Sequence, residues 1–123
     1  MINLILADTS VLIELLRGNS EIEEKLEDAE VATCFHVKYE LYRGTNIARK
    51  TEEGKEQIEA LLEELETIEL TRDVARKASE LRERYSINTF DLMIAATAIV
   101  NNMELITQDT DFQKIEELEV EKT

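Results

Sequence analysis

Four acidic residues occupy positions where a carboxylate is costly unless a cation or hydrogen bonds stabilise it. Asp8 and Asp109 each follow a short apolar run, whereas Glu40 and Asp91 each lie inside an apolar stretch with helical periodicity. Moving a charged group into apolar surroundings is unfavourable when it has no partner there. The pattern therefore predicts that the four carboxylates share one site, and that this site binds a divalent cation.

The chemistry of such a site follows from its ligand types. Clustered carboxylates repel one another, and a bound cation removes that repulsion. Mg²⁺ and Mn²⁺ prefer oxygen ligands, and a chain with one Cys and one His lacks the ligand cluster typical of zinc. One or two such ions can polarise a phosphate oxygen, prepare hydroxide and neutralise a leaving oxygen. Hydroxyls beside the acids, from Thr9, Ser10 and Thr107, are expected to orient the carboxylates.

Each acid also has a simpler interpretation when it is taken by itself. Asp8 could be only a helix N-cap, and Asp91 could only cap the helix that it begins. Asp109 could be a turn residue, and Glu40 could be an ordinary acid on a helix surface. The occurrence of all four in one chain is what favours a functional site.

The elements that must position these acids alternate along the chain. Strands are expected at residues 2–7, 30–34, 67–70, 104–107 and 118–121. Helices are expected at residues 11–17, 20–27, 36–48, 51–66, from 71 or 72 to 85, and 87–101, with a helical turn or two within 111–118. This alternation predicts an α/β fold with helices on both faces of a central, mainly parallel sheet of four to five strands. Ligands bind beyond the carboxyl ends of such strands. The acids at positions 8 and 109 meet only if their two strands are neighbours.

Length and composition limit the possible classes of protein. A chain of 123 residues predicts one domain, residues 1–123, and no apolar run reaches the roughly 18 residues that a membrane span needs. The first residues carry no basic leader, and one cysteine fits a reducing compartment, so a cytoplasmic location is expected. With 14 basic and 28 acidic residues, the net charge of −14 suits no broad basic surface for nucleic acid. Any action on nucleic acid would have to be local and assisted by metal.

Four segments carry a resemblance to a known family. They are ADTSVLIELLRG at residues 7–18, YELYRG at 39–44, TFDLMIAA at 89–96 and LITQDTDF at 105–112. In this order, and across nearly the whole chain, they resemble the PIN-domain ribonucleases, and within them the VapC-type toxins of toxin–antitoxin pairs. Each motif alone is degenerate, but four in order form a specific pattern.

The resemblance implies a three-layer α/β/α sandwich and Mg²⁺- or Mn²⁺-dependent cleavage of RNA by a metal-activated water. It implies that Asp8, Asp91 and Asp109 are the main metal ligands, that Glu40 holds metal or orients the water, and that Asp111 supports them. It further implies a homodimer and a small antitoxin protein, whose basic tail would be compatible with a net charge of −14.

Two departures from the family pattern stand out. The stretch TCFH at residues 33–36 has Cys34 where the family usually has a hydroxyl. Cations for an RNA path are few, and they are expected to be ordinary helix-surface residues: Arg17, Lys38, Arg43, Arg49 and Lys50.

The neighbouring aromatic and sulfur-bearing residues have structural interpretations that we prefer. Cys34 and His36 lack a third group to activate a nucleophile, so a buried thiol and a surface imidazole are expected. Phe35, Tyr39 and Tyr42 could stack on bases, but their helical spacing favours packing in the core or in a dimer.

Two other functions remain as alternatives. A phosphotransfer domain of the receiver or phosphatase type also uses Asp at strand ends with Mg²⁺, but the sequence Asp8-Thr9-Ser10 lacks the second acid that such domains need. A non-catalytic, PIN-like binding module is the other alternative, and the intact set of acids argues against it.

Overall fold

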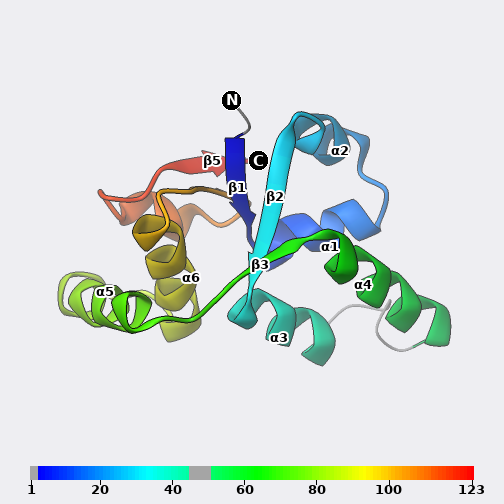
Figure 1. The fold of residues 1–123 in the computed structure, drawn as a ribbon. Coiled ribbons are helices and arrows are strands. Elements are labelled where there is room, and N and C mark those ends of the chain that lie inside the picture. Colours follow the sequence, from blue (N-terminus) through cyan, green and yellow to red (C-terminus); the bar gives the residue numbers. More distant parts are fainter. Residues whose placement is uncertain (1–2, 45–50) are drawn as a thin grey trace.

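A computed structural model describes residues 3–44 and 51–123, which form one five-stranded sheet covered by helices (Figure 1). The strands are β1 (Asn3–Ala7), β2 (Ala29–Cys34), β3 (Glu66–Ile68), β4 (Glu104–Thr107) and β5 (Val120–Lys122). Their order in the sheet is β3-β2-β1-β4-β5, and every neighbouring pair is parallel. The predicted parallel α/β architecture is confirmed.

The register of the central strands decides which side chains meet at the carboxyl edge. β1 and β4 are neighbours, with Leu6 opposite Leu105 and Ala7 opposite Ile106. The backbone N–H of Asp8 donates to the Ile106 carbonyl oxygen at 3.0 Å, so the pairing continues one residue past β1. The chain segments that follow β1 and β4 therefore leave the sheet side by side, as a shared acidic site requires.

Helices cover both faces of the sheet and its carboxyl edge. In Figure 1, α5 (Arg72–Arg84) and α6 (Thr89–Val100) lie on one side, and α1 (Thr9–Leu16), α2 (Ser20–Leu26) and α4 (Glu52–Glu64) lie on the other. Helix α3 (Phe35–Arg43) follows β2 directly and contacts both α1 and α6. Because α3 touches both layers at the strand ends, it brings residues of the two helical layers to one place.

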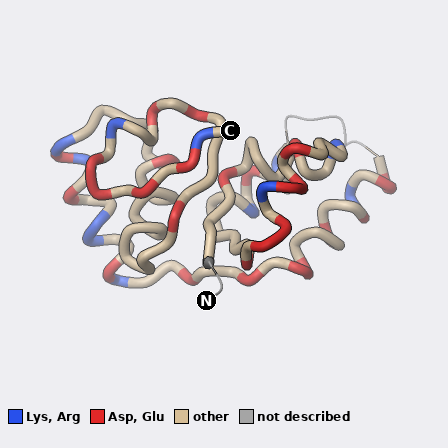
Figure 2. The backbone as a smooth tube through the Cα atoms, turned by 90° about the horizontal axis from the view of Figure 1, so that it is seen from above, with Lys and Arg blue, Asp and Glu red and all other residues tan. Residues whose placement is uncertain are grey.

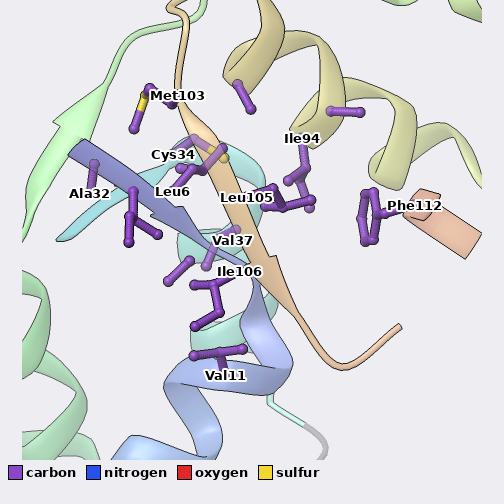
Figure 3. Packing of buried hydrophobic residues seen from close by; sticks show 14 of the residues in the cluster. Leu6, Val11, Ala32, Cys34, Val37, Ile94, Met103, Leu105, Ile106 and Phe112 are labelled. Carbon is purple, nitrogen blue, oxygen red and sulfur yellow. The ribbon is translucent and has the colours of Figure 1, made fainter. Parts of the chain in front are cut away.

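The core fills the space on both faces of β4. Leu105 lies toward Ile94 of α6, whereas Ile106 lies toward Val11 of α1 (Figure 3). All four side chains are fully buried. Strands that are buried on both faces are expected to be continuously apolar, which explains why β1 and β4 read as short apolar runs.

Several element boundaries differ from those predicted. Helix α1 begins at Thr9 rather than at residue 11, because Asp8 is itself the N-cap and accepts from the Thr9 N–H. Helix α3 ends at Arg43, because Gly44 has a φ of +54° that breaks the helical path. The rest of that predicted helix, residues 45–48, and residue 2 of the first predicted strand lie outside the described residues.

Smaller shifts affect the C-terminal half of the chain. Helix α4 ends at Glu64, and strand β3 spans residues 66–68 rather than 67–70. The segment after β4 forms a short 3-10 helix, η2 (Thr110–Lys114), and β5 spans residues 120–122 rather than 118–121. Both edges of the sheet are thus three-residue strands. Within residues 3–44 and 51–123, no helix is long and apolar enough to cross a membrane.

Candidate active site

Asp8 lies at the centre of the site and is held by hydrogen bonds on both of its oxygens. It ends β1, caps α1 and is only 7% exposed. Its Oδ1 accepts from the Thr9 N–H at 2.8 Å, and its Oδ2 accepts from the Thr107 hydroxyl at 2.7 Å. The Ser10 hydroxyl is a more distant donor, 3.5 Å from Oδ2. Burial raises the pKa of Asp8, and the hydrogen bond from Thr107 is the strongest opposing influence.

Thr107 connects the two acids that follow the central strands. Its fully buried hydroxyl donates to Asp8 and accepts from the backbone N–H of Asp109 at 3.0 Å. Asp109 in turn caps η2, where its Oδ1 accepts from the Asp111 N–H at 2.9 Å. The Ser10 hydroxyl accepts from the Gln108 N–H at 3.3 Å, which adds a second link between the loops after β1 and β4. The hydroxyls of Ser10 and Thr107 thus contact the groups that they are predicted to orient, and the supporting role itself stays a prediction.

Glu40 reaches the same region from α3. Its Oε1 accepts from the Thr9 hydroxyl at 2.9 Å, so Thr9 contacts Asp8 through its backbone and Glu40 through its side chain. Burial raises the pKa of Glu40, the Thr9 hydrogen bond opposes that shift, and the nearby Asp8 carboxylate adds to it. Glu40 is therefore a member of the acidic cluster rather than an isolated acid on a helix surface.

Asp91 is the least compensated of the acids. It lies in the first turn of α6, after the Asn88 cap. No hydrogen bond from a described residue reaches its carboxylate, and its pKa is raised to about 6. The largest cause is burial, and the carboxylates of Asp8, Asp109, Glu40 and Asp111 add repulsion. Acids from four separate segments thus lie within electrostatic reach of one another.

Asp111 occupies the outer side of this cluster. Its carboxylate is about half exposed and pairs with Lys114 at 3.0 Å. It contributes to the repulsion felt by Asp91, but part of its charge is balanced by the lysine beside it. Asp111 is therefore placed to support the site rather than to form its centre.

The donor chemistry of the cluster fits a hard divalent cation, although the ligands do not form a closed cage. Within residues 3–44 and 51–123, no three Asp, Glu, His or Cys side chains are arranged to hold a metal ion as they stand. Mg²⁺ does not need such a cage, since it commonly binds through one or two carboxylates, several waters and substrate phosphates. Buried carboxylates with raised pKa values are the groups that gain most from a cation.

Cys34 and His36 are only partly as predicted. The thiol of Cys34 is buried, and its pKa is raised chiefly by burial and also by the carboxylates of Asp8 and Glu40. The prediction of a surface imidazole is wrong, because His36 is only 8% exposed and lies edge-on between Phe35 and Phe90. Burial lowers the pKa of His36. An inert thiol and a neutral imidazole give no sign of a nucleophilic pair.

For the aromatic residues of α3, packing in the core is wrong, and the alternative, packing in a dimer, stays a prediction. Phe35, Tyr39 and Tyr42 are 57%, 44% and 47% exposed. Phe90, in the first turn of the predominantly apolar helix α6, is 37% exposed. The sequence shows that Phe90 precedes the acid of its motif, but nothing in the pattern indicates that this side of α6 is left uncovered.

Those cations of the predicted RNA path that the structure describes form no broad surface. Acidic and basic positions are interleaved along most of the chain (Figure 2). Arg17 pairs with Glu14 at 3.1 Å, and Lys38 is half-buried on α3. Arg49 and Lys50 lie outside the described residues.

One cation near the site was missed by the sequence reasoning. Arg82 of α5 donates through Nη2 to the Ile87 carbonyl oxygen at 2.7 Å and to the Thr89 hydroxyl at 2.9 Å. Its guanidinium thereby fixes the turn that leads into α6, two residues before Asp91. The useful signal would have been an arginine at the end of one helix that is followed closely by the start of the next.

Known proteins resemble this chain in sequence and in fold. The PIN-domain family model matches residues 5–118. The chain is 33% identical over 118 residues to Ribonuclease VapC5 of Mycobacterium tuberculosis, covering 89% of this chain and 85% of that protein.

Similar folds occur among solved toxin–antitoxin structures. VapBC2 of Rickettsia felis, bound to a DNA fragment from its promoter, has a TM-score of 0.84 at 22% identity, with 98% of each chain covered. A toxin–antitoxin complex from Klebsiella pneumoniae has a TM-score of 0.79 at 29% identity, with 93% of this chain and 94% of that chain covered. The family match removes the basis for a receiver-like or phosphatase-like domain. The chain belongs to the PIN-domain family of nucleases, as a VapC-type member.

Proposed function

We propose that this protein is a Mg²⁺- or Mn²⁺-dependent endoribonuclease that hydrolyses RNA phosphodiesters with an activated water. One observation carries the proposal: Asp8, Glu40, Asp91 and Asp109 come from four separate segments, and their charges act on one another at the carboxyl edge of the sheet. Repulsion within such a cluster lowers the stability of the folded protein. A bound cation would offset that repulsion and could take part in the reaction.

The proposed roles of the acids use the oxygen lone pairs that their hydrogen bonds leave open. Asp8, Asp91 and Asp109 would hold the metal, directly or through its bound waters, and when bound it would supply Lewis acidity and lower the pKa of water. Thr107 and the Thr9 N–H fix the direction of the Asp8 carboxylate. Glu40 keeps Oε1 on the Thr9 hydroxyl, and its Oε2 has no hydrogen bond from a described residue. That free oxygen can accept the proton of the attacking water, and the raised pKa of Glu40 suits a general base.

The partners and setting of the enzyme belong to the same proposal. Relatives in the solved structures occur as toxin–antitoxin complexes, which supports a small antitoxin as the partner of this chain. A basic antitoxin segment entering the acidic site would complement the net charge of −14. We further propose that the chain acts as a single domain, as a homodimer, and in the cytoplasm.

The decisive experiment separates the acids of the site from acids elsewhere. RNA cleavage is followed by gel electrophoresis for the wild type, Asp8→Asn, Asp91→Asn and the control Glu116→Gln, whose side chain is 85% exposed and outside the cluster. The first two variants should lose cleavage while keeping a native circular dichroism spectrum, and the control should keep it. EDTA should stop RNA cleavage by the wild type, and added Mn²⁺ should restore this activity. Full activity in both Asn variants, or activity that ignores EDTA, contradicts the proposal, and a folded wild type without any activity would favour a non-catalytic binding module.

A further inference from the structure

Four aromatic rings form a continuous row beside the acidic cluster. The ring centroids of Phe35 and His36 are 5.6 Å apart, those of His36 and Phe90 4.9 Å, and those of Phe90 and Tyr39 5.5 Å. The row joins α3 to the start of α6, two helices that contact each other. His36 is the buried member, and its edge-on contacts hold the phenylalanine rings on either side in place.

The other three rings of the row are exposed to an unusual degree. Phe35 is 57%, Tyr39 44% and Phe90 37% exposed. Isolated apolar residues on a surface need no explanation, but neighbouring aromatic side chains that are left open together commonly mark a binding surface. We call Phe35, Tyr39 and Phe90, with the buried His36 that supports them, the aromatic row.

The aromatic row borders the candidate active site through the chain itself. Tyr39 directly precedes Glu40 on α3, and Phe90 directly precedes Asp91 on α6. Glu40 and Asp91 act on each other electrostatically, so the Tyr39–Phe90 contact lies where the two helices present their acids. A chain held at the acids would therefore pass these rings within a residue or two of the reacting phosphate.

The negative net charge of the protein favours base stacking over ionic contacts to phosphates as the way to bind RNA beside the site. A net charge of −14 repels phosphates at long range, and within residues 3–44 and 51–123 no broad basic surface compensates for it. Stacking of a base on an aromatic ring needs no charge and binds every base through its π-face. Lys38 lines a hollow of about 260 Å³ together with Phe35 and Glu69, so a cation and an acid both lie beside the outer end of the aromatic row.

The angles between the rings decide between paired and unpaired bases. Neighbouring planes meet at 84°, 82° and 67°. Bases within a duplex lie parallel, about 3.4 Å apart, so they cannot follow rings that stand nearly perpendicular to each other. Only a strand whose bases are separated can rest on more than one of these rings.

We propose that the aromatic row is a stacking surface for the unpaired bases that flank the phosphate cleaved at the acidic site. The inference rests on the proposed ribonuclease function and assigns the residues that contact the bases of its substrate. A second copy of the chain is the competing occupant of these rings. RNA is favoured as the occupant because Tyr39 and Phe90 directly precede Glu40 and Asp91, so a subunit contact on these rings would cover the place where the substrate phosphate must bind.

The test compares ring removal on the aromatic row with ring removal elsewhere on the same helix. Tyr39→Leu, Phe90→Leu and the double variant are measured beside Tyr42→Leu, a control whose ring is 47% exposed but lines a separate hollow with Lys55, Ile58 and Glu59. The substrate is one RNA oligonucleotide, used as a single strand and annealed to its complement. The readouts are kcat and KM with Mg²⁺, RNA binding by fluorescence anisotropy, and molar mass by light scattering.

The expected result is a rise in KM for the single strand of about tenfold for each ring removed, with kcat nearly unchanged. Tyr42→Leu should match the wild type, and the double variant should lose the preference for the single strand over the duplex. The loss should be the same at low and high salt, because stacking is not a charge interaction.

The outcomes separate this inference from the proposed function. Normal KM in both single variants, while the wild type cleaves RNA, overturns the stacking surface alone. Ring-dependent RNA binding without EDTA-sensitive cleavage supports the stacking surface and overturns the catalytic proposal. A wild type that neither cleaves nor binds RNA overturns both. A change in molar mass that accompanies loss of the rings assigns them to a subunit contact, and likewise overturns the inference.

Discussion

Replacing Asp91 with Asn should make the metal-free protein more stable. The folded-state pKa of Asp91 is raised from 3.8 to about 6, so the folded state favours the protonated, neutral side chain. Ionised Asp91 therefore costs stability, and this cost grows as the pH rises from about 4 and is complete above about pH 6. Asn carries no charge at any of these pH values, so the variant avoids the cost.

The magnitude follows from the size of the pKa shift. A difference of about two pKa units corresponds to about 3 kcal/mol if the site is fully shielded from solvent. Asp91 is only half-buried, so screening by water reduces the expected gain to about 1–2 kcal/mol at pH 7.5. At pH 5, which stays above the isoelectric point of about 4.4, the gain should fall to about half, because folded Asp91 is then mostly protonated.

Urea unfolding in EDTA, followed by circular dichroism, measures this difference at both pH values. Glu116→Gln removes the same charge from an exposed position, and it corrects for the general benefit of lowering a net charge of −14. We expect the control to change the free energy of unfolding by a few tenths of a kcal/mol at most. If Asp91→Asn is no more stable than the control at pH 7.5, or if its gain does not depend on pH, the mutual repulsion inferred for the site is wrong.

Three further predictions concern the same region. Mg²⁺ should raise the melting temperature of the wild type in calorimetry, by an amount equivalent to about 2.7 kcal/mol at a hundred times its Kd, and an equal rise in Asp8→Asn would refute metal binding at Asp8. Thr107→Val should lower the free energy of urea unfolding by about 1–3 kcal/mol, because the buried Asp8 carboxylate loses its 2.7 Å donor, whereas Thr107→Ser should keep most of the stability. Arg82→Met should cost about 1–2 kcal/mol and slow RNA cleavage, because the turn before α6 loses two hydrogen bonds. Arg76→Met, at a 67% exposed position on the same helix, is its control and should behave as the wild type in both assays.

Much of the fold was predictable because buried parallel strands have a simple signature. Residues 2–7 and 104–107 read as apolar runs, and residues 3–7 and 104–107 form neighbouring strands that precede Asp8 and Asp109. The end of α3 was not predictable from periodicity, since the pattern predicts a helix over residues 36–48 and Gly44 is the C-cap. Local pattern gives the type of an element more reliably than its last residue.

Some features of the candidate site could likewise be predicted from the sequence, and others could not. The sequence singles out the acids because each follows or interrupts an apolar run, and their roles stay predictions. In the structure the hydroxyls of Thr9 and Thr107 donate to Glu40 and Asp8. Exposure of Phe90 and burial of His36 could not be predicted, because both depend on which distant element covers the residue. An aromatic residue at helical spacing has the same sequence pattern whether a neighbour packs on it or solvent does.

The short outer strands have a consequence for how any partner protein can attach. A peptide that binds by strand addition needs a long row of free backbone groups, and β3 and β5 each offer only three residues. Short edge strands with charged neighbours also resist edge-to-edge pairing between the sheets of two molecules. Recognition of this protein must then run through side chains on its helices and loops, which a binding partner can distinguish from those of other toxins, rather than through main-chain groups that all sheets share.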